Sequence, residues 1–129
     1  MSNRIIQNWV SLAEYDLETA IAMQNSGRYI YVAFTCQQTI EKILKALYIN
    51  EKEETPPYTH NLLKLLEKTS LLSSLTEEQR EFIENLNSYY MESRYTEHVD
   101  ILNQSLTQNV AESLLNKTEE LFSWLKAKL

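Results

Sequence analysis

The sequence predicts an all-α protein, an antiparallel up-and-down bundle of five helices, and three observations lead to this fold class. The chain of 129 residues contains one glycine and two adjacent prolines, whereas a β-sandwich or barrel needs many turns rich in these residues. Apolar residues recur at helical spacing along most of the chain. The interruptions are short, and short connections favour helices that pack as antiparallel neighbours. The length fits one domain spanning residues 1–129.

The first half of the chain contains two long predicted helices. Helical spacing of apolar residues places the first over residues 4–26, and Gly27 follows where a helix C-terminus favours a left-handed residue. The second, over residues 28–50, carries apolar residues on two sides, which is typical of a central helix or of one shared with a second chain. A polar loop at 51–57 contains both prolines, and a leucine-rich helix is expected at 59–71.

The second half contains two more predicted helices. Thr76 and Gln79 match a capping box, in which the two residues satisfy exposed amides reciprocally, so a helix should begin there and continue to residue 94. Residues 95–104 are expected to form a non-helical or loosely helical connection. The last helix is expected over residues 105–126, because leucines and a valine form one apolar stripe there.

Composition and charge exclude several classes of function. The formal net charge is −6, from 12 basic and 18 acidic residues, and no basic run occurs, which disfavours binding to extended duplex DNA. A small site for a nucleotide or an RNA end is compatible with this charge. Cys36 is the only cysteine, so an internal disulfide is excluded, which suits a reducing compartment. The N-terminus lacks a signal peptide's apolar core and no apolar run could span a membrane, so we expect a cytoplasmic protein.

Two ionisable residues stand out against their surroundings. Asp16 lies within the apolar stripe of the first helix, where a buried carboxylate must be paired or neutral. It either faces a ligand or forms a structural pair with a Tyr, His or Lys of a neighbouring helix. His60 lies near the start of the third helix, whose positive end favours the neutral imidazole. This ring either accepts a hydrogen bond in a functional site or serves in capping and packing.

A polar face runs along the second predicted helix. Gln38, Glu41 and Lys45 are spaced by three and four residues and therefore share one side of the helix, roughly opposite its main apolar stripe. Glu41 and Lys45 can form an ion pair at this spacing. The face is either solvated or forms a polar groove beside Tyr31 and Phe34 that could hold a nucleotide or a partner helix.

The densest group of candidate residues lies at the end of the fourth predicted helix. Arg94 carries a planar cation suited to phosphate, Tyr95 follows it, and His98 comes four residues after the arginine. An arginine that holds a scissile phosphate and a histidine that moves a proton could cleave RNA without a metal. Otherwise, Arg94 caps the helix beside an exposed histidine. The two histidines and one cysteine lack the spacing of metal ligands, so no metal or other cofactor is expected.

A set of short motifs extends over nearly the whole chain, from Trp9 to Leu125. They are Trp9 with residues 13–17 and Ala20, Gly27-Arg28-Tyr29, residues 33–46 with the pattern Gln-Gln-x-x-Glu-Lys-x-x-Lys-Ala, Thr59-His60-Asn61-Leu62 with Leu65, and Arg94-Tyr95. Each motif alone has low specificity. Together they resemble the HEPN domain family, the higher-eukaryote and prokaryote nucleotide-binding domains.

The resemblance implies a five-helix, largely antiparallel bundle, often a homodimer, in a bacterial or archaeal cytoplasmic protein. Short stand-alone members are commonly encoded beside a minimal nucleotidyltransferase, with which they form a toxin–antitoxin module or act as the substrate-binding subunit. Many members are metal-independent RNases, whose motif is an Arg, four to six intervening residues and a His at a dimer cleft. Here three residues separate Arg94 from His98, and Thr96 replaces the Pro that usually follows Arg-Tyr in the most similar subgroup.

We therefore expect a protein that binds a nucleotide or a partner, as the accessory component of such a module. The expected binding residues are Asp16, Gln38, Glu41, Lys45, His60, Arg94 and Tyr95. The alternative is an RNase toxin that uses Arg94 with His98, although Glu97 would place a negative charge beside an incoming phosphate. A third, simpler interpretation is a structural interaction module whose surface only dimerises.

Overall fold

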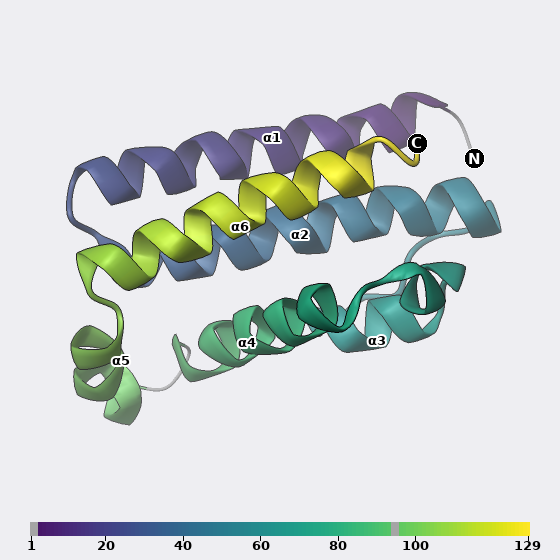
Figure 1. The fold of residues 1–129 in the computed structure, drawn as a ribbon. Coiled ribbons are helices and arrows are strands. Elements are labelled where there is room, and N and C mark those ends of the chain that lie inside the picture. The colour runs from purple at the N-terminus through teal and green to yellow at the C-terminus, as the bar shows by residue number, and fades with distance from the viewer. Residues whose placement is uncertain (1–2, 94–95) are drawn as a thin grey trace.

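The computed structural model describes residues 3–93 and 96–129, and within these ranges the chain forms helices and connections without any strand. Figure 1 shows the arrangement. The α-helices are α1 (Asn3–Asn25), α2 (Tyr29–Lys52), α3 (Leu62–Glu67), α4 (Glu77–Ser93), α5 (Val99–Ser105) and α6 (Gln108–Lys126), and the 3-10 helices are η1 (Ser70–Ser74) and η2 (Thr96–His98). The all-α fold class is confirmed, with one more α-helix than the five expected.

Helix α2 lies at the centre of the bundle. It contacts α1, α3, α4, α5 and α6, and α1 runs antiparallel to it along most of its length (Figure 1). Helix α6 contacts both α1 and α2. The side chains of Ile40, Ile43 and Leu44 in α2 are almost completely buried. This central position explains why the α2 sequence is apolar on more than one side.

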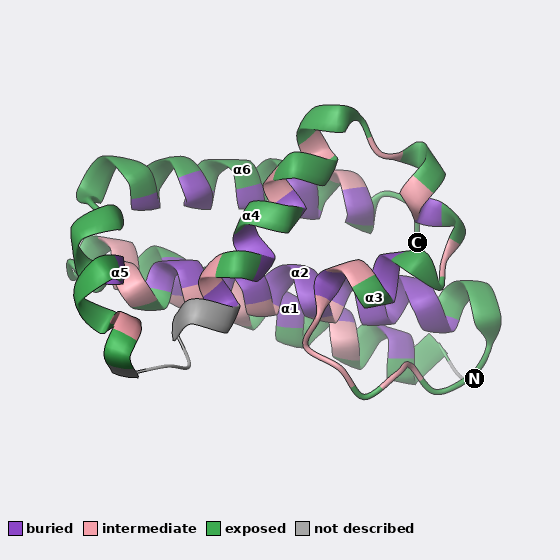
Figure 2. Ribbon diagram, turned by 90° about the horizontal axis from the view of Figure 1, so that it is seen from below, coloured by how far each residue is buried: buried purple, intermediate pink, exposed green. Residues whose placement is uncertain are grey.

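The outer helices each bury one side. Figure 2 shows buried residues of α6 on the side turned towards the rest of the bundle and exposed residues on the opposite side. Leu114, Leu121 and Leu125 are among the buried residues of α6, and their spacing of seven and four places them on one face of a helix. Helices α1, α2, α3, α4 and α6 contribute to one continuous hydrophobic core.

Two helix ends have the local structure that the sequence predicts. Gly27 closes α1 with a φ of 76°, in the left-handed region that glycine adopts without strain. At the start of α4, the amide of Thr76 donates to Oε1 of Gln79 at 2.9 Å, and the amide of Gln79 donates to Oγ1 of Thr76 at 3.1 Å. The predicted capping box is therefore present, and it fixes the first turn of α4.

Two segments differ from the expected elements. The helix expected over residues 59–71 is split into α3 and η1, because Oγ1 of Thr69 accepts a hydrogen bond from the amide of Leu71 at 3.3 Å and starts a new turn. The connection expected over residues 95–104 contains α5. Oγ1 of Thr107 accepts from the amide of Val110 at 3.3 Å, so α6 begins three residues after the expected start.

Within the described ranges, no helix combines the length and the hydropathy needed to cross a membrane.

Candidate functional site

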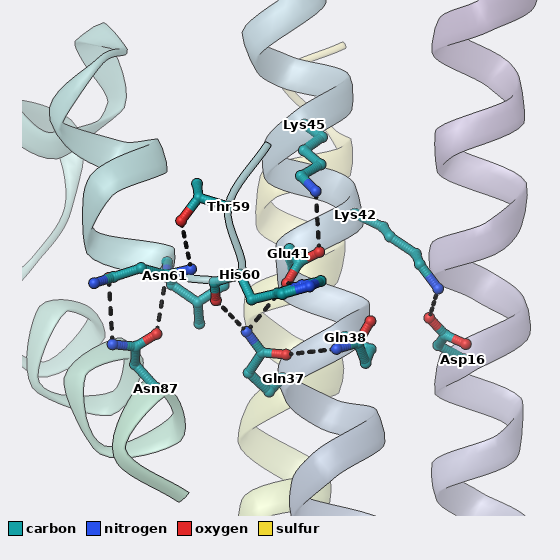
Figure 3. A network of polar contacts seen from close by, with 11 residues as sticks. Asp16, Gln37, Gln38, Glu41, Lys42, Lys45, Thr59, His60, Asn61 and Asn87 are labelled. Carbon is teal, nitrogen blue, oxygen red and sulfur yellow. Dashed lines mark hydrogen bonds and ion pairs between the residues drawn. The ribbon is translucent and has the colours of Figure 1, made fainter. Parts of the chain in front are cut away.

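The carboxylate of Glu41, on α2, is the centre of a buried polar network. Glu41 is only 2% exposed. Its Oε2 accepts a hydrogen bond from Nζ of Lys45 at 3.1 Å, and its Oε1 lies 2.9 Å from Nδ1 of His60 and accepts from Nε2 of Gln37 at 3.4 Å (Figure 3). Three neighbouring groups therefore compensate for the loss of water around this carboxylate.

Lys45 provides the opposite charge and is itself 6% exposed. The ion pair between Lys45 and Glu41 has the i,i+4 spacing that the sequence predicts. The ammonium of Lys45 also lies 5.3 Å from the centre of the Trp9 ring on α1, a distance at which the ring face attracts a cation. Glu41 and Lys45 therefore do not belong to a solvated helix face, and that alternative does not hold for these two residues.

Gln37 connects the network to the loop before α3, and sequence reasoning did not single it out. Its side chain is fully buried; Nε2 donates to the carbonyl oxygen of His60 at 2.7 Å, and Oε1 accepts from Nε2 of Gln38 at 3.1 Å. Gln37 lies one turn before Glu41 on α2, so its position in the sequence contained the signal that could have identified it.

The backbone around His60 is held by two asparagines. Oδ1 of Asn61 accepts from the amide of Leu63 at 3.0 Å and caps α3, and Nδ2 of Asn87 on α4 donates to the same oxygen at 3.3 Å. Oδ1 of Asn87 accepts from the amide of Leu62 at 3.0 Å (Figure 3). These bonds join α4 to the start of α3 and thereby position His60 against Glu41 on α2.

A row of rings passes beside this network and joins several segments of the chain. Tyr31 meets Phe34 edge to face with 6.5 Å between centroids, and Phe34 stacks on Tyr90 of α4 at 5.3 Å. The rings of Tyr90 and His60 are 5.5 Å apart, and those of His60 and Tyr58 are 6.3 Å apart. We call these five residues the aromatic row. Its two ends are exposed, Tyr31 at 56% and Tyr58 at 98%.

A cavity of about 260 Å³ adjoins the network at Lys45. The loop that follows α2 forms one wall with Pro56, Pro57 and Tyr58. The ring of Trp9 lies on another side of the cavity. A largely apolar pocket with one buried ammonium has the composition of a site for an organic ligand that carries a polar group.

Asp16 lies apart from this network. Its carboxylate accepts a hydrogen bond from Nζ of Lys42 on α2, and both side chains are partly buried. The pair joins α1 to α2 and shares no hydrogen bond with Glu41 (Figure 3). The structure therefore shows the pair with a lysine of the neighbouring helix, and a role of Asp16 in ligand binding stays a prediction.

The remaining candidates lie at the end of α4 and beyond it. Arg94 and Tyr95 lie outside the described residues. His98 ends η2 and precedes α5, where its side chain makes no capping hydrogen bond to the helix. Within the described part of the chain, no group of three or more His, Cys, Asp or Glu residues is arranged to hold a metal ion.

Comparison with known families places this fold and site in context. The model of the HEPN domain matches residues 6–128. The chain belongs to the HEPN domain family. At the level of the family, membership supports a function in binding nucleotides or RNA, or in cleaving RNA.

The solved structures include a similar fold. The crystal structure of TT1696 from Thermus thermophilus superposes with a TM-score of 0.82 at 24% sequence identity, covering 99% of this chain and 100% of that one. This likeness supports the fold of the HEPN chain in the ranges that the structure describes. No curated protein sequence matches the chain.

Proposed function

We propose that this HEPN protein binds a nucleotide or a nucleotide-like ligand beside the Glu41 network. The observation that carries the proposal is a cavity lined both by Lys45, the buried partner of Glu41, and by Tyr58, the exposed end of the aromatic row. Aromatic rings supply faces on which bases stack, and buried polar groups discriminate between ligands by hydrogen bonding.

The exposed ring of Tyr58 is suited to stack on a base. It is 98% exposed and lines the cavity together with Lys45 and Trp9. A base that enters between Tyr58 and Trp9 would replace water on both rings and bring a polar group within reach of the Lys45 ammonium.

Calorimetric titration with purine and pyrimidine mononucleotides tests this function. Stacking on an aromatic ring contributes about 1–3 kcal/mol per base, so Tyr58→Ala should weaken binding by about 5-fold to 150-fold. Tyr15→Ala is the matched control, because Tyr15 is also exposed, at 68%, but lies on α1 outside the site. Equal affinities of the two variants would show that the ligand does not bind at Tyr58.

We also propose that the protein acts as a homodimer and as the accessory component of a minimal nucleotidyltransferase in a toxin–antitoxin type of module. This proposal rests on the resemblance of the sequence to short stand-alone HEPN proteins. Sedimentation of the pure protein tests the dimer, and titration with a transferase encoded beside its gene tests the partner. Binding neither to nucleotides nor to such a transferase would contradict the proposed function.

The alternative is a metal-independent RNase that uses Arg94 with His98, which the family-level function supports. It predicts that expression arrests growth, that Arg94→Ala relieves the arrest, and that the cleaved RNA carries cyclic phosphate ends. Full toxicity of the Arg94→Ala variant would exclude this mechanism.

A further inference from the structure

A second cavity lies between α4 and α6, and it shares no residue with the Glu41 network or the aromatic row. Its volume is about 580 Å³. The side chains of Phe82, Leu121 and Trp124 supply its apolar surface, and Leu121 and Phe82 also pack against the main core. We call this cavity the α4–α6 groove. Its size and partly buried aromatic rings are typical of a surface that accepts a large apolar side chain.

The charged residues that line the groove are predominantly acidic, beside the neutral Thr76, Gln79 and Asn85. Glu78 and Glu81 from α4 and Glu120 from α6 line it, together with one cation, Lys117. None of these four residues forms an ion pair with the described part of the chain, in contrast to Glu84 on the same helix α4, which pairs with Arg80 at 3.5 Å. These four lining residues therefore carry a formal net charge of −2.

The position of these charges is only partly explained by helix stability. Glu78 lies in the first turn of α4, where the helix dipole favours an acidic residue. Glu81 lies beyond that turn, and Glu120 lies in the second half of α6, where the dipole gives an acidic residue no advantage. The helix dipole therefore does not explain the positions of Glu81 and Glu120.

The negative charge of the groove disfavours a second copy of this chain as its occupant and favours a cationic one. A second copy of the chain docked on the same surface would bring two sets of three carboxylates together, and each chain already carries a net charge of −6. The chain itself shows that a ring of the groove accepts a cation, because Nζ of Lys128 lies 4.1 Å from the centre of the Trp124 ring.

We propose that the α4–α6 groove binds a cationic amphipathic segment of a partner protein, with one large apolar side chain inserted among Phe82, Leu121 and Trp124 and flanking Lys or Arg residues beside Glu81 and Glu120. An amphipathic helix laid in a groove is a common mode of peptide recognition. The flanking cations would neutralise the unpaired carboxylates, and the apolar anchor would cover the rings.

The probe for this proposal is a labelled synthetic peptide of leucine and lysine with helical periodicity, compared with the same peptide carrying glutamate for lysine. Anisotropy should show binding of the lysine peptide alone. The double variant Glu81→Lys, Glu120→Lys should bind the lysine peptide at least tenfold more weakly. The control, Glu18→Lys with Glu112→Lys, changes the net charge equally at positions outside the groove and should leave binding within twofold.

A second measurement locates the peptide. In a Trp9→Phe background, Trp124 is the only tryptophan, so its emission should shift to shorter wavelength when the apolar anchor covers the ring. Equal weakening by the groove variant and the control would show non-specific attraction to an acidic protein. That result, the absence of binding, or dimerisation that the Glu81→Lys, Glu120→Lys variant abolishes would overturn the proposal.

Discussion

At the scale of single residues, Glu41 and Lys45 depend on each other for their burial. Replacing Glu41 by alanine leaves the Lys45 ammonium buried beside the Trp9 ring without its carboxylate partner. It also removes the acceptor beside Nδ1 of His60, whereas Gln37 keeps its hydrogen bond to the carbonyl oxygen of His60. Removal of one partner of a buried ion pair costs about 3–5 kcal/mol, so we expect Glu41→Ala to lower the free energy of unfolding by that amount. Urea denaturation followed by circular dichroism measures it.

The exposed pair Arg80–Glu84 provides the control for this prediction. Its side chains are 57% and 50% exposed, and an exposed pair contributes about 0–1 kcal/mol. Glu41→Ala should therefore cost several times more than Glu84→Ala. Comparable losses of unfolding free energy in the two variants would show that water reaches Lys45 and replaces the carboxylate of Glu41.

Cys36 gives a second prediction at this scale. Burial raises the pKa of its thiol to about 12, from an ordinary value of 9.0. At a pH between the two pKa values, the unfolded thiol has lost its proton while the native thiol retains it. The native state then binds more protons, so the free energy of unfolding falls as pH rises. The difference between the two pKa values corresponds to at most about 4 kcal/mol by pH 12.

The comparison of Cys36 with Cys36→Ala isolates this contribution from the tyrosines and lysines that titrate in the same range. The stability of the wild-type protein should decline more steeply than that of the variant above pH 9. Parallel curves for the two proteins would mean that the native thiol ionises as readily as the unfolded one.

At the scale of the elements, the start of α3 depends on a hydrogen bond from outside the helix. Asn87→Ala would leave the buried amide of Leu62 without its acceptor and Asn61 without the Nδ2 donor. A buried donor left unpaired costs about 1–3 kcal/mol, so we expect a loss of stability in this range. Because the same bonds position His60, amide exchange should also accelerate in α3 and not in α1.

Ser88→Ala is the control for the Asn87 variant, since Ser88 is the next residue of α4 and is exposed. Its effect on the free energy of unfolding should stay within about 0.5 kcal/mol. If Asn87→Ala had an equally small effect, another group would have to satisfy the amide of Leu62.

The long helices were predictable because their signals are local. Gly27 ends α1 and the Thr76–Gln79 box starts α4, and each of these signals is complete within four residues of the chain. The break between α3 and η1 was missed, because Thr69 is an ordinary helix-compatible residue until its side chain caps the amide of Leu71. The leucines on both sides of this break form a continuous apolar stripe, which predicts a single helix.

The sequence predicts one face of α2 and, separately, His60 as candidate site residues, but it does not predict the contact between them. The spacing of Gln38, Glu41 and Lys45 placed them together, and their i,i+4 pair is confirmed. The burial of Glu41 and Lys45 depends on the loop that carries Tyr58 and His60, which follows α2 and returns across it. That return is a contact between segments distant in sequence, and helical periodicity contains no information about it.

At the scale of the whole molecule, α2 couples all the other helices. It contacts α1, α3, α4, α5 and α6, and five of these six helices share one continuous core. The pair Asp16–Lys42 joins α1 to α2, and Glu41–His60 joins α2 to the segment before α3. Loss of α2 would therefore expose the apolar sides of the other helices at once.

This coupling predicts a single cooperative unfolding transition, and the two tryptophans allow it to be tested from opposite ends of the sequence. Trp9 reports on α1 and Trp124 on α6, and both pack against the main core. Urea curves from the emission of Trp124→Phe and Trp9→Phe proteins should each coincide with their own far-ultraviolet circular dichroism. Ile40→Ala, at the fully buried centre of α2, should lower the free energy of unfolding by about 2–5 kcal/mol in both backgrounds. If α6 unfolded at lower urea than α1, or if Ile40→Ala shifted only one tryptophan, the bundle would consist of separable units and α2 would not be its common support.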